Sequence, residues 1–283
     1  MTAQLVVELG HDAGELVLAT RTPDIAAGLV PGAHARFADF NQPESLREAF
    51  RGVRRLLLIS TDTVTDRGRQ HASAIDAAVA AGVEHIVYTS MLSPAPPNPA
   101  LIAESHWSTE EHLRASGVDF TILRCSLYSD FQVFEAAEAL ASGRFVHNRG
   151  SAGCSYIARN DCARAAAVVA GEGHAGGYYE LTGPESLDAP ALAALYSEFG
   201  DREVEAVSVD DDELLRQLDA DASTDGHVQY GAALAISLGR AIREEYFAGV
   251  TTTFAELTGT APRGVASLLE ESKTAQRPPV AGP

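Results

Sequence analysis

Apolar segments of strand length alternate with helical segments through the first half of this chain, and that alternation most restricts its fold. Such strands, separated by helices, form a parallel sheet with helices on both faces. The chain is therefore predicted to be an α/β protein with a doubly wound, Rossmann-like parallel sheet. The expected strands are Leu16–Thr20, His34–Ala38, Arg55–Ile59, His85–Thr89 and Phe120–Leu123, and the expected helices are Pro43–Phe50, Arg67–Ala81 and Glu104–Ser116.

The second half of the chain has a looser pattern and predicts a smaller α/β lobe. We assign residues 1–150 to a Rossmann-like nucleotide-binding region, 151–271 to a substrate-side lobe packed on it, and 272–283 to a mobile tail. Asn160 is the predicted N-cap of one helix in this half. The expected elements are helices at Phe131–Ala141, Asp161–Ala170 and Ala189–Phe199, a helix begun by Asp210–Glu213, and strands near Phe145, at Tyr178–Leu181 and at Glu203–Val209.

Charge and cysteine content exclude several functions. The 283 residues include 39 acidic and 21 basic side chains, giving a formal charge of −18 at pH 7. This charge repels a phosphate backbone, so no nucleic-acid partner is expected. Cys125, Cys154 and Cys162 are not spaced in metal-binding pairs, so neither a disulfide framework nor a metal site is predicted.

The hydropathy pattern gives no sign of a membrane partner. No apolar run approaches the ~18 residues that cross a bilayer, and the N-terminus lacks the pattern of a signal peptide. We expect a cytoplasmic protein.

The opening segment, MTAQLVVELGHDAGELVLATR, begins with a helical stretch that leads into a strand. In a nucleotide-binding α/β domain, a strand and a glycine-rich loop precede that helix, because backbone N–H groups of the loop hold the pyrophosphate. None of the 24 glycines makes this pattern between a strand and a helix. The segment GEGHAG matches GxGxxG, but it follows a helix and precedes a strand, as expected for caps and turns. We therefore expect a sheet that lacks its first strand.

Polar residues follow two of the expected strands. Arg21 and Thr22 end one strand at the place where a guanidinium can hold the 2′-phosphate of NADP; the alternative is a solvated surface arginine. Ser60, Thr61 and Asp62 follow the run LLLI, at the carboxyl end of the strand Arg55–Ile59, where ligands bind in open α/β sheets. These three residues could also cap the following helix.

Several longer stretches carry a family pattern: RRLLLISTDT, DRGRQHASAIDAAVAAGVEHIVYTSML, ESHWSTEEHLRASGVDFTILR and YYELTGPESL. Together with the closing LTGTAPRGVASLL they resemble the NmrA-like atypical short-chain dehydrogenases, and within them the NAD(P)H:quinone oxidoreductase type. The resemblance extends from Leu5 to about Leu269 and equates Leu5–Arg21 with the family's first helix and second strand. Two explanations for the absent strand and loop stay open: a start codon assigned too late, or a natural variant without the usual pyrophosphate cradle.

The resemblance implies further cofactor contacts beside the nicotinamide of NADPH. Arg159 would close the site or, alternatively, pair with Asp161. In the loop after FTILR, Ser129 or Asp130 could instead cap a helix. The implied contacts in this loop are Cys125, Ser126, Leu127, Tyr128, Ser129 and Asp130.

Catalysis cannot use the tyrosine–lysine pair of classical short-chain dehydrogenases. The only lysine, Lys273, lies in the expected tail. By family alignment His106 takes the place of the catalytic lysine. Glu110 lies four residues later on the same helix face, where its carboxylate could orient the imidazole, and such a histidine could act as acid or base near neutral pH. The alternative is a His and a Glu that border a cleft without chemistry.

The resemblance implies an NADPH-dependent oxidoreductase that reduces a quinone or a similar small carbonyl acceptor. Two other classes remain: a non-catalytic dinucleotide sensor or scaffold, and a redox-neutral enzyme of specialised metabolism that uses the cofactor cleft for another ligand. The unpaired strand edges of an incomplete sheet predict a homodimer.

Overall fold

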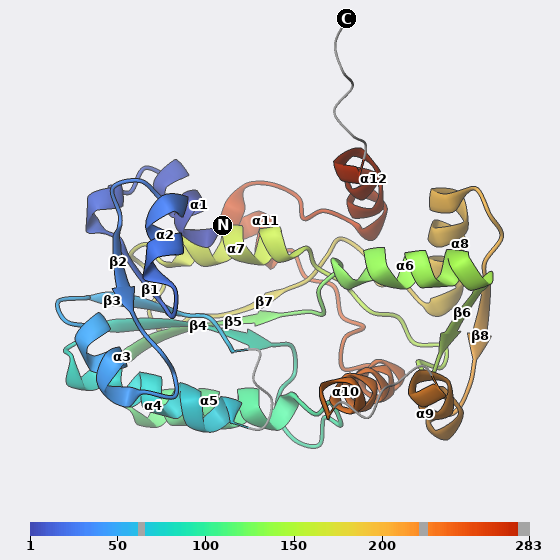
Figure 1. Ribbon diagram of the computed structural model, residues 1–283, viewed down its shortest axis with the longest axis horizontal. Coiled ribbons are helices and arrows are strands. Elements are labelled where there is room, and N and C mark those ends of the chain that lie inside the picture. The colour runs from blue at the N-terminus through green and yellow to red at the C-terminus, as the bar shows by residue number, and fades with distance from the viewer. Residues whose placement is uncertain (62–65, 221–225, 277–283) are drawn as a thin grey trace, which may run out of the picture.

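The computed structural model describes residues 1–61, 66–220 and 226–276, and its centre is a parallel sheet between two helical layers (Figure 1). The strands are β1 (Val17–Thr20), β2 (His34–Phe37), β3 (Arg55–Leu58), β4 (His85–Met91), β5 (Asp119–Cys125), β6 (Arg144–His147), β7 (Tyr178–Leu181) and β8 (Glu205–Ser208). The helices are α1 (Thr2–Glu8), α2 (Pro23–Leu29), α3 (Pro43–Ala49), α4 (Arg67–Ala80), α5 (Ala103–Ala115), α6 (Phe131–Ser142), α7 (Arg159–Val169), α8 (Ala189–Gly200), α9 (Asp211–Ala220), α10 (Gly226–Arg243), α11 (Thr253–Thr258) and α12 (Val265–Gln276).

The central strands fall into two parallel sheets. Strands β3, β4, β5 and β7 form a four-stranded sheet in that order, whereas β1 and β2 pair only with each other. Within the described residues, β1 and β3 each have one edge without a strand partner. The split lies between β1 and β3, and the expectation that a first strand is missing from the sheet stays a prediction.

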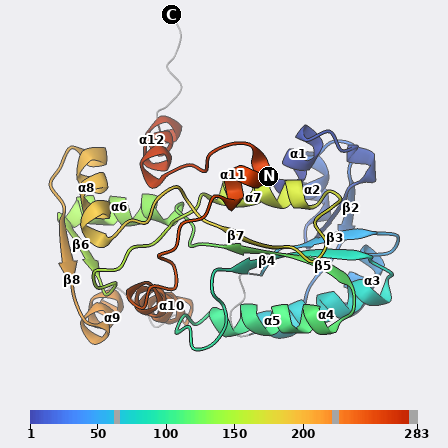
Figure 2. The same ribbon diagram turned by 180° about the vertical axis from the view of Figure 1, so that it is seen from behind.

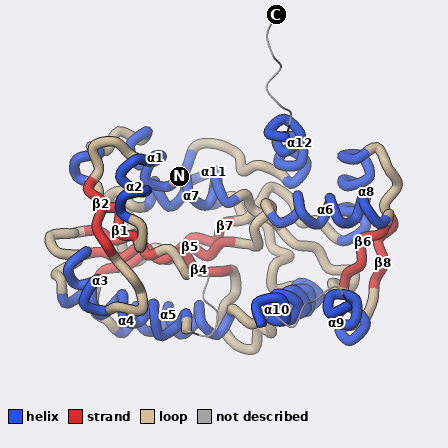
Figure 3. The backbone as a smooth tube through the Cα atoms, viewed as in Figure 1, coloured by secondary structure: helices blue, strands red, loops and turns tan. Residues whose placement is uncertain are grey.

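Alternating side chains of β4 supply the cores on the two faces of the four-stranded sheet. Ile86 and Tyr88 pack with Ile75 and Leu113 under α4 and α5, and Val87 packs on the opposite face with residues of α7 and α11. Successive strand residues point to opposite faces, and a parallel sheet covered on both sides is apolar at every position. Figure 3 shows the strands between the two helical layers.

A smaller lobe lies beside the main sheet, built on the parallel pair β6 and β8 (Figure 2). Its core holds Phe145, Tyr196 and Phe247, among others. The β6–β8 pair and the β5–β7 pair both join strands from opposite sides of residue 150. The division of the chain into two regions at residue 150 stays a prediction.

The expected strands and most expected helices are confirmed within one or two residues, with two differences. Helix α7 begins at Arg159 after Ala158, so Asn160 is not its N-cap. The carboxylate of Asp130 accepts the backbone N–H of Arg159 at 2.8 Å and caps the helix from outside. Helix α12 continues to Gln276 and so contains the first residues of the expected tail, whereas 277–283 lie outside the described residues.

Candidate functional site

The carboxyl end of β1 presents a free cationic side chain. Arg21 and Thr22 are exposed, and Thr22 is anchored by its backbone N–H, which donates to Oγ1 of Thr20 at 3.3 Å. Within the described residues no carboxylate forms an ion pair with Arg21. Its guanidinium is therefore available to an anionic ligand at the edge of the sheet.

The carboxyl end of β3 is held by side chains from β4 and α4. The backbone N–H of Ser60 donates to Oγ1 of Thr89 at 3.0 Å, and that of Thr61 donates to Nε2 of His71 at 3.0 Å. Asp62, the third residue expected here, lies outside the described residues.

The last residue of β5 and the loop after it are mostly buried. Cys125, Ser126 and Ser129 are only 4%, 3% and 0% exposed. Ser126 bonds to Leu181 through its backbone N–H, and Leu127 packs on the core of the smaller lobe. This segment therefore joins the sheet to the smaller lobe, and Leu127, Tyr128 and Asp130 are its half-buried members.

Arg159 comes together with two residues of that loop. Its guanidinium lies 5.3 Å from the ring centre of Tyr128, and its backbone N–H bonds to Asp130. The alternative pairing of Arg159 with Asp161 is wrong. Asp161 instead accepts from the backbone N and the Nε of Arg263, at 2.8 and 3.1 Å, because the chain before α12 passes beside the start of α7.

A buried hydrogen-bond network connects α4, α5 and β4. Nε2 of His71 accepts the N–H of Thr61, so the neutral ring carries its proton on Nδ1. That nitrogen lies 3.0 Å from Oγ1 of Thr109, whose own hydrogen is donated to the carbonyl of Ser105. Both contacts require the same tautomer of His71.

The tautomer of His71 fixes the next bond in the network. The hydroxyl of Tyr88 lies 3.3 Å from Nδ1 of His71 and 2.7 Å from Nδ1 of His106. Since Nδ1 of His71 is already protonated, it cannot accept the Tyr88 hydrogen, and the shorter contact makes Nδ1 of His106 the acceptor. A neutral His106 therefore carries its proton on Nε2 and can donate from that atom.

Burial keeps both histidines neutral. Desolvation, with a smaller contribution from the charge of Arg67, lowers the pKa of His71 to about 4 and that of His106 to about 3. Burial also raises the pKa of Tyr88 above its usual range. The expectation that His106 titrates near neutral pH is therefore wrong. The ring is a fixed hydrogen-bond donor there.

Glu110 does not orient His106, contrary to expectation. Its carboxylate is fully buried and accepts from Oγ of Ser90 at 2.7 Å, from Nη2 of Arg114 at 2.7 Å, and from Nε and Nη2 of Arg124 at 3.0 and 2.7 Å. Two guanidiniums attract the carboxylate more strongly than a neutral imidazole does. Glu110 ties α5 to β4 and β5.

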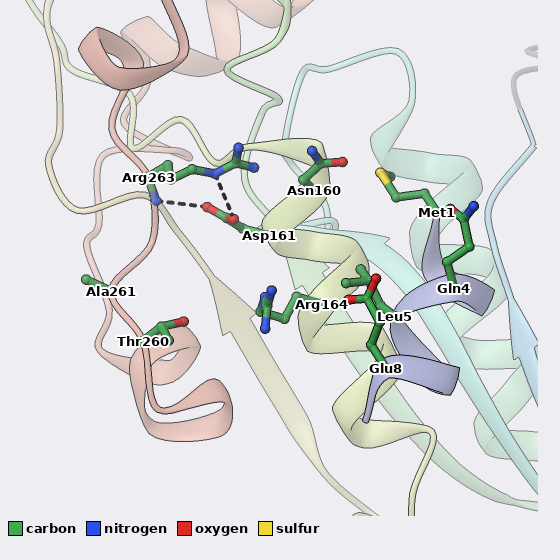
Figure 4. Close-up of a pocket in the computed structure, with 10 residues that line it drawn as sticks. All are labelled: Met1, Gln4, Leu5, Glu8, Asn160, Asp161, Arg164, Thr260, Ala261 and Arg263. Carbon is green, nitrogen blue, oxygen red and sulfur yellow. Dashed lines mark hydrogen bonds and ion pairs between the residues drawn. The ribbon is translucent and has the colours of Figure 1, made fainter. Parts of the chain in front are cut away.

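A groove of about 530 Å³ lies between α1, α7 and the segment before α12 (Figure 4). None of the site residues expected from the sequence lines it. Arg164 reaches into this region without an ion-pair partner in the described part of the chain, while Asp161 and Arg263 pair with each other across one end.

Neither a metal cluster nor a membrane span is found in the parts of the chain that the structure describes. No three or more His, Cys, Asp or Glu side chains gather there at metal-binding distance. None of the helices described is both long and apolar enough to cross a bilayer.

A split, Rossmann-like parallel sheet with polar residues at its carboxyl edge defines a nucleotide-binding α/β protein. The family model described as NAD(P)H-binding matches residues 1–172, and the chain belongs to this family.

Relatives and solved structures agree with this assignment. Quinone oxidoreductase 2 of Escherichia coli K12 is 40% identical over 184 residues, which are 64% of this chain and 64% of that protein. The crystal structure of an NADPH-dependent quinone oxidoreductase from Escherichia coli, complexed with NADPH, superposes with a TM-score of 0.88 at 29% identity and covers 96% of both chains. The Citrobacter triphenylmethane reductase complexed with NADP(H) gives a TM-score of 0.87 at 28% identity, over 96% of this chain and 95% of that one.

The sequence reasoning missed the partners of His106. The sequence pattern places Tyr88 in a strand and His71 in a helix, and it places Arg67 at a helix start. A signal was present, since tyrosine and histidine stood at core positions of otherwise apolar elements, where polar atoms need partners.

Proposed function

We propose that this protein is an NADPH-dependent oxidoreductase that reduces a quinone or a similar small carbonyl acceptor. The observation that carries the proposal is the match, over 96% of both chains, to a quinone oxidoreductase that binds NADPH. The free guanidinium of Arg21 at the end of β1 supports the choice of NADPH over NADH.

The residues at the sheet edge fit one end of the cofactor. Arg21 would hold the 2′-phosphate, and Ser60 and Thr61 border the neighbouring strand end. Tyr128 and Arg159 would lie toward the nicotinamide. Within the described residues there is no glycine turn that could hold the pyrophosphate. We therefore assign no protein contact to the pyrophosphate.

His106 is the residue we assign to the acceptor. Bound NADPH supplies the hydride. The Nε2–H of His106, held by Tyr88, would donate a hydrogen bond to the acceptor oxygen and stabilise the negative charge that develops there. Because the ring stays neutral, it would act as an electrophilic donor and not as a proton source near pH 7.

The test is a titration of NADPH into the purified chain, followed by nicotinamide fluorescence, with NADH for comparison. We expect saturable NADPH binding that weakens in Arg21→Ala and is unchanged in Arg51→Ala, an exposed arginine that pairs with Glu48. Menadione reduction should then be measured. Absence of binding at millimolar NADPH would refute the proposal and favour a scaffold or a redox-neutral enzyme that uses the cleft for another ligand.

We further propose a homodimer in the cytoplasm. Within the described residues β2 has an unpaired outer edge, and such edges favour pairing with another chain. Cys125, Cys154 and Cys162 are free and buried, which suits a reducing compartment. A monomer by light scattering at micromolar concentration would refute the dimer.

A further inference from the structure

Arg67 is a buried cation that forms no ion pair within the described residues. It begins α4 and is only 8% exposed. Its Nε donates to the carbonyl of Thr61 at 2.8 Å, but its Nη1 is buried without a hydrogen-bond partner. Across the described residues no carboxylate lies within ion-pair distance of it. A buried charge left unpaired is costly, and native proteins retain one where a ligand compensates it.

Other orphaned donors accompany this guanidinium. Oγ1 of Thr61 and the hydroxyl of Tyr230 on α10 are also buried without a partner. The carbonyl of Thr61 accepts a hydrogen bond from Arg67. Burial raises the pKa of the Tyr230 phenol, and the charge of Arg67 partly offsets that rise. Unsatisfied donors therefore come to one region from three places: the end of β3, the start of α4 and the start of α10.

The groups around Arg67 do not neutralise it. His71 and His106 are uncharged, and Tyr88 donates its hydrogen to His106. Glu110 is already bound by two other arginines. Among the residues that the structure describes, these neighbours supply polar contacts but no carboxylate that pairs with Arg67.

We propose that Arg67, with Thr61 and Tyr230, binds the ionised oxygen of a small organic acid, and that this acid group belongs to the acceptor reduced at His106. Binding of the anion does not depend on the cofactor, whereas its role as part of the acceptor rests on the proposed function. A single guanidinium balances one negative charge, so a carboxylate fits this site better than a phosphate dianion does.

Benzoate, benzamide and inorganic phosphate are the probes. Each is titrated calorimetrically into the full chain near neutral pH without NADPH. We expect benzoate to bind, benzamide to bind at least about tenfold more weakly, and phosphate to bind more weakly than benzoate. Phosphate binding that equals or exceeds benzoate binding would overturn the assignment to a carboxylate, and failure of benzoate to bind would overturn the site.

Variants of two neighbouring arginines assign the binding to Arg67. Arg67→Met should lose benzoate affinity by about tenfold or more, and Arg67→Lys, which keeps the charge, should lose less. Arg69→Met is the matched control, because Arg69 lies on the same helix but is exposed and paired with Asp66. Equal losses in Arg67→Met and Arg69→Met would overturn the proposal.

Thermal unfolding separates a ligand role from a structural one. Removal of an uncompensated buried charge should leave the unfolding temperature of Arg67→Met unchanged or higher. A large decrease, or failure to fold, would mean that Arg67 is a structural residue and would overturn the site.

Turnover tests the role of the acid in the acceptor. With NADPH, a naphthoquinone that carries a carboxylate should lose kcat/KM in Arg67→Met, while its methyl ester should not. An equal loss for both would overturn the acceptor assignment. Absence of any quinone reduction, with benzoate binding intact, would refute the proposed function and the acceptor role but leave the anion site standing.

Discussion

The hydroxyl of Tyr88 donates to Nδ1 of His106 across 2.7 Å, and this bond sets the tautomer of a buried ring. The direction of the bond follows from His71, whose Nδ1 is already protonated. A neutral imidazole whose tautomer is fixed in this way presents one defined N–H, at Nε2.

Tyr88→Phe should remove the hydrogen bond that fixes the tautomer of His106, with little change in side-chain volume. We expect a loss of about 1–2 kcal/mol in unfolding free energy, because Nδ1 of His106 is left buried without a donor. Menadione reduction should fall in kcat more than KM rises. Urea denaturation and steady-state kinetics measure the two effects. Tyr178→Phe, on an exposed tyrosine that binds Arg114, should change stability by less than about 0.5 kcal/mol.

Stability should fall between pH 6.5 and 4 through His71. Its pKa is lowered in the folded state to about 4, so the unfolded chain binds the extra proton in this range and stability rises with pH. The lowered pKa corresponds to on the order of 3 kcal/mol, present above pH 6.5 and lost as the pH falls toward 4.

The comparison of His71→Asn with His11→Gln tests this pH dependence. His11 is exposed. Urea denaturation at several pH values should show a shallower slope only in the His71 variant. Identical slopes in both variants and the parent would contradict the assignment.

Glu110→Gln should destabilise the fold by about 3 kcal/mol. The change keeps the shape of the side chain but removes the charge that two guanidiniums and Ser90 share in a buried place. Glu111→Gln is the control on the next residue, since Glu111 pairs with Arg114 and its side chain is 55% exposed. Equal midpoints in urea for the two variants would show that Glu110 contributes no more than a surface ion pair.

Gly183→Ala should cost about 2–4 kcal/mol. A Cβ at this glycine of the LTGPES stretch would stand 1.9 Å from the backbone oxygen of Tyr156, so the backbone must shift. Gly231→Ala in α10 meets open space and should leave stability unchanged or raise it by up to about 1 kcal/mol. Thermal denaturation of both variants distinguishes a packing requirement from a general intolerance of alanine.

Local sequence patterns predicted the sheet but not the long-range contacts. The run HIVYTS has the apolar character of a strand buried on both faces, and β4 forms there. His106 and Glu110 do share a helix face, yet each binds a different element, because the choice of partner depends on which strands pass beneath the helix. Spacing within α5 carries no information about Tyr88 or Arg124.

The same limit applies to charged residues at the edge of the site. Asp161 lies two residues from Arg159 but binds Arg263, which is far along the chain. Arg67 was predicted as a helix start, which it is, but its burial comes from the tertiary arrangement. The sequence predicted where polar residues gather at the sheet edge, but it left open which of them have hydrogen-bond or ion-pair partners.

The split between β1 and β3 affects local unfolding of the sheet. A two-stranded unit with few ladder hydrogen bonds has a low free energy of local unfolding, so amide hydrogens of β1 and β2 should exchange with solvent well before those of β4 and β5. A ligand that contacts Arg21 on one side of the split and Thr61 on the other would slow that exchange. The hydrogen exchange of β1 and β2, the least protected strands, would then report whether the ligand site is occupied.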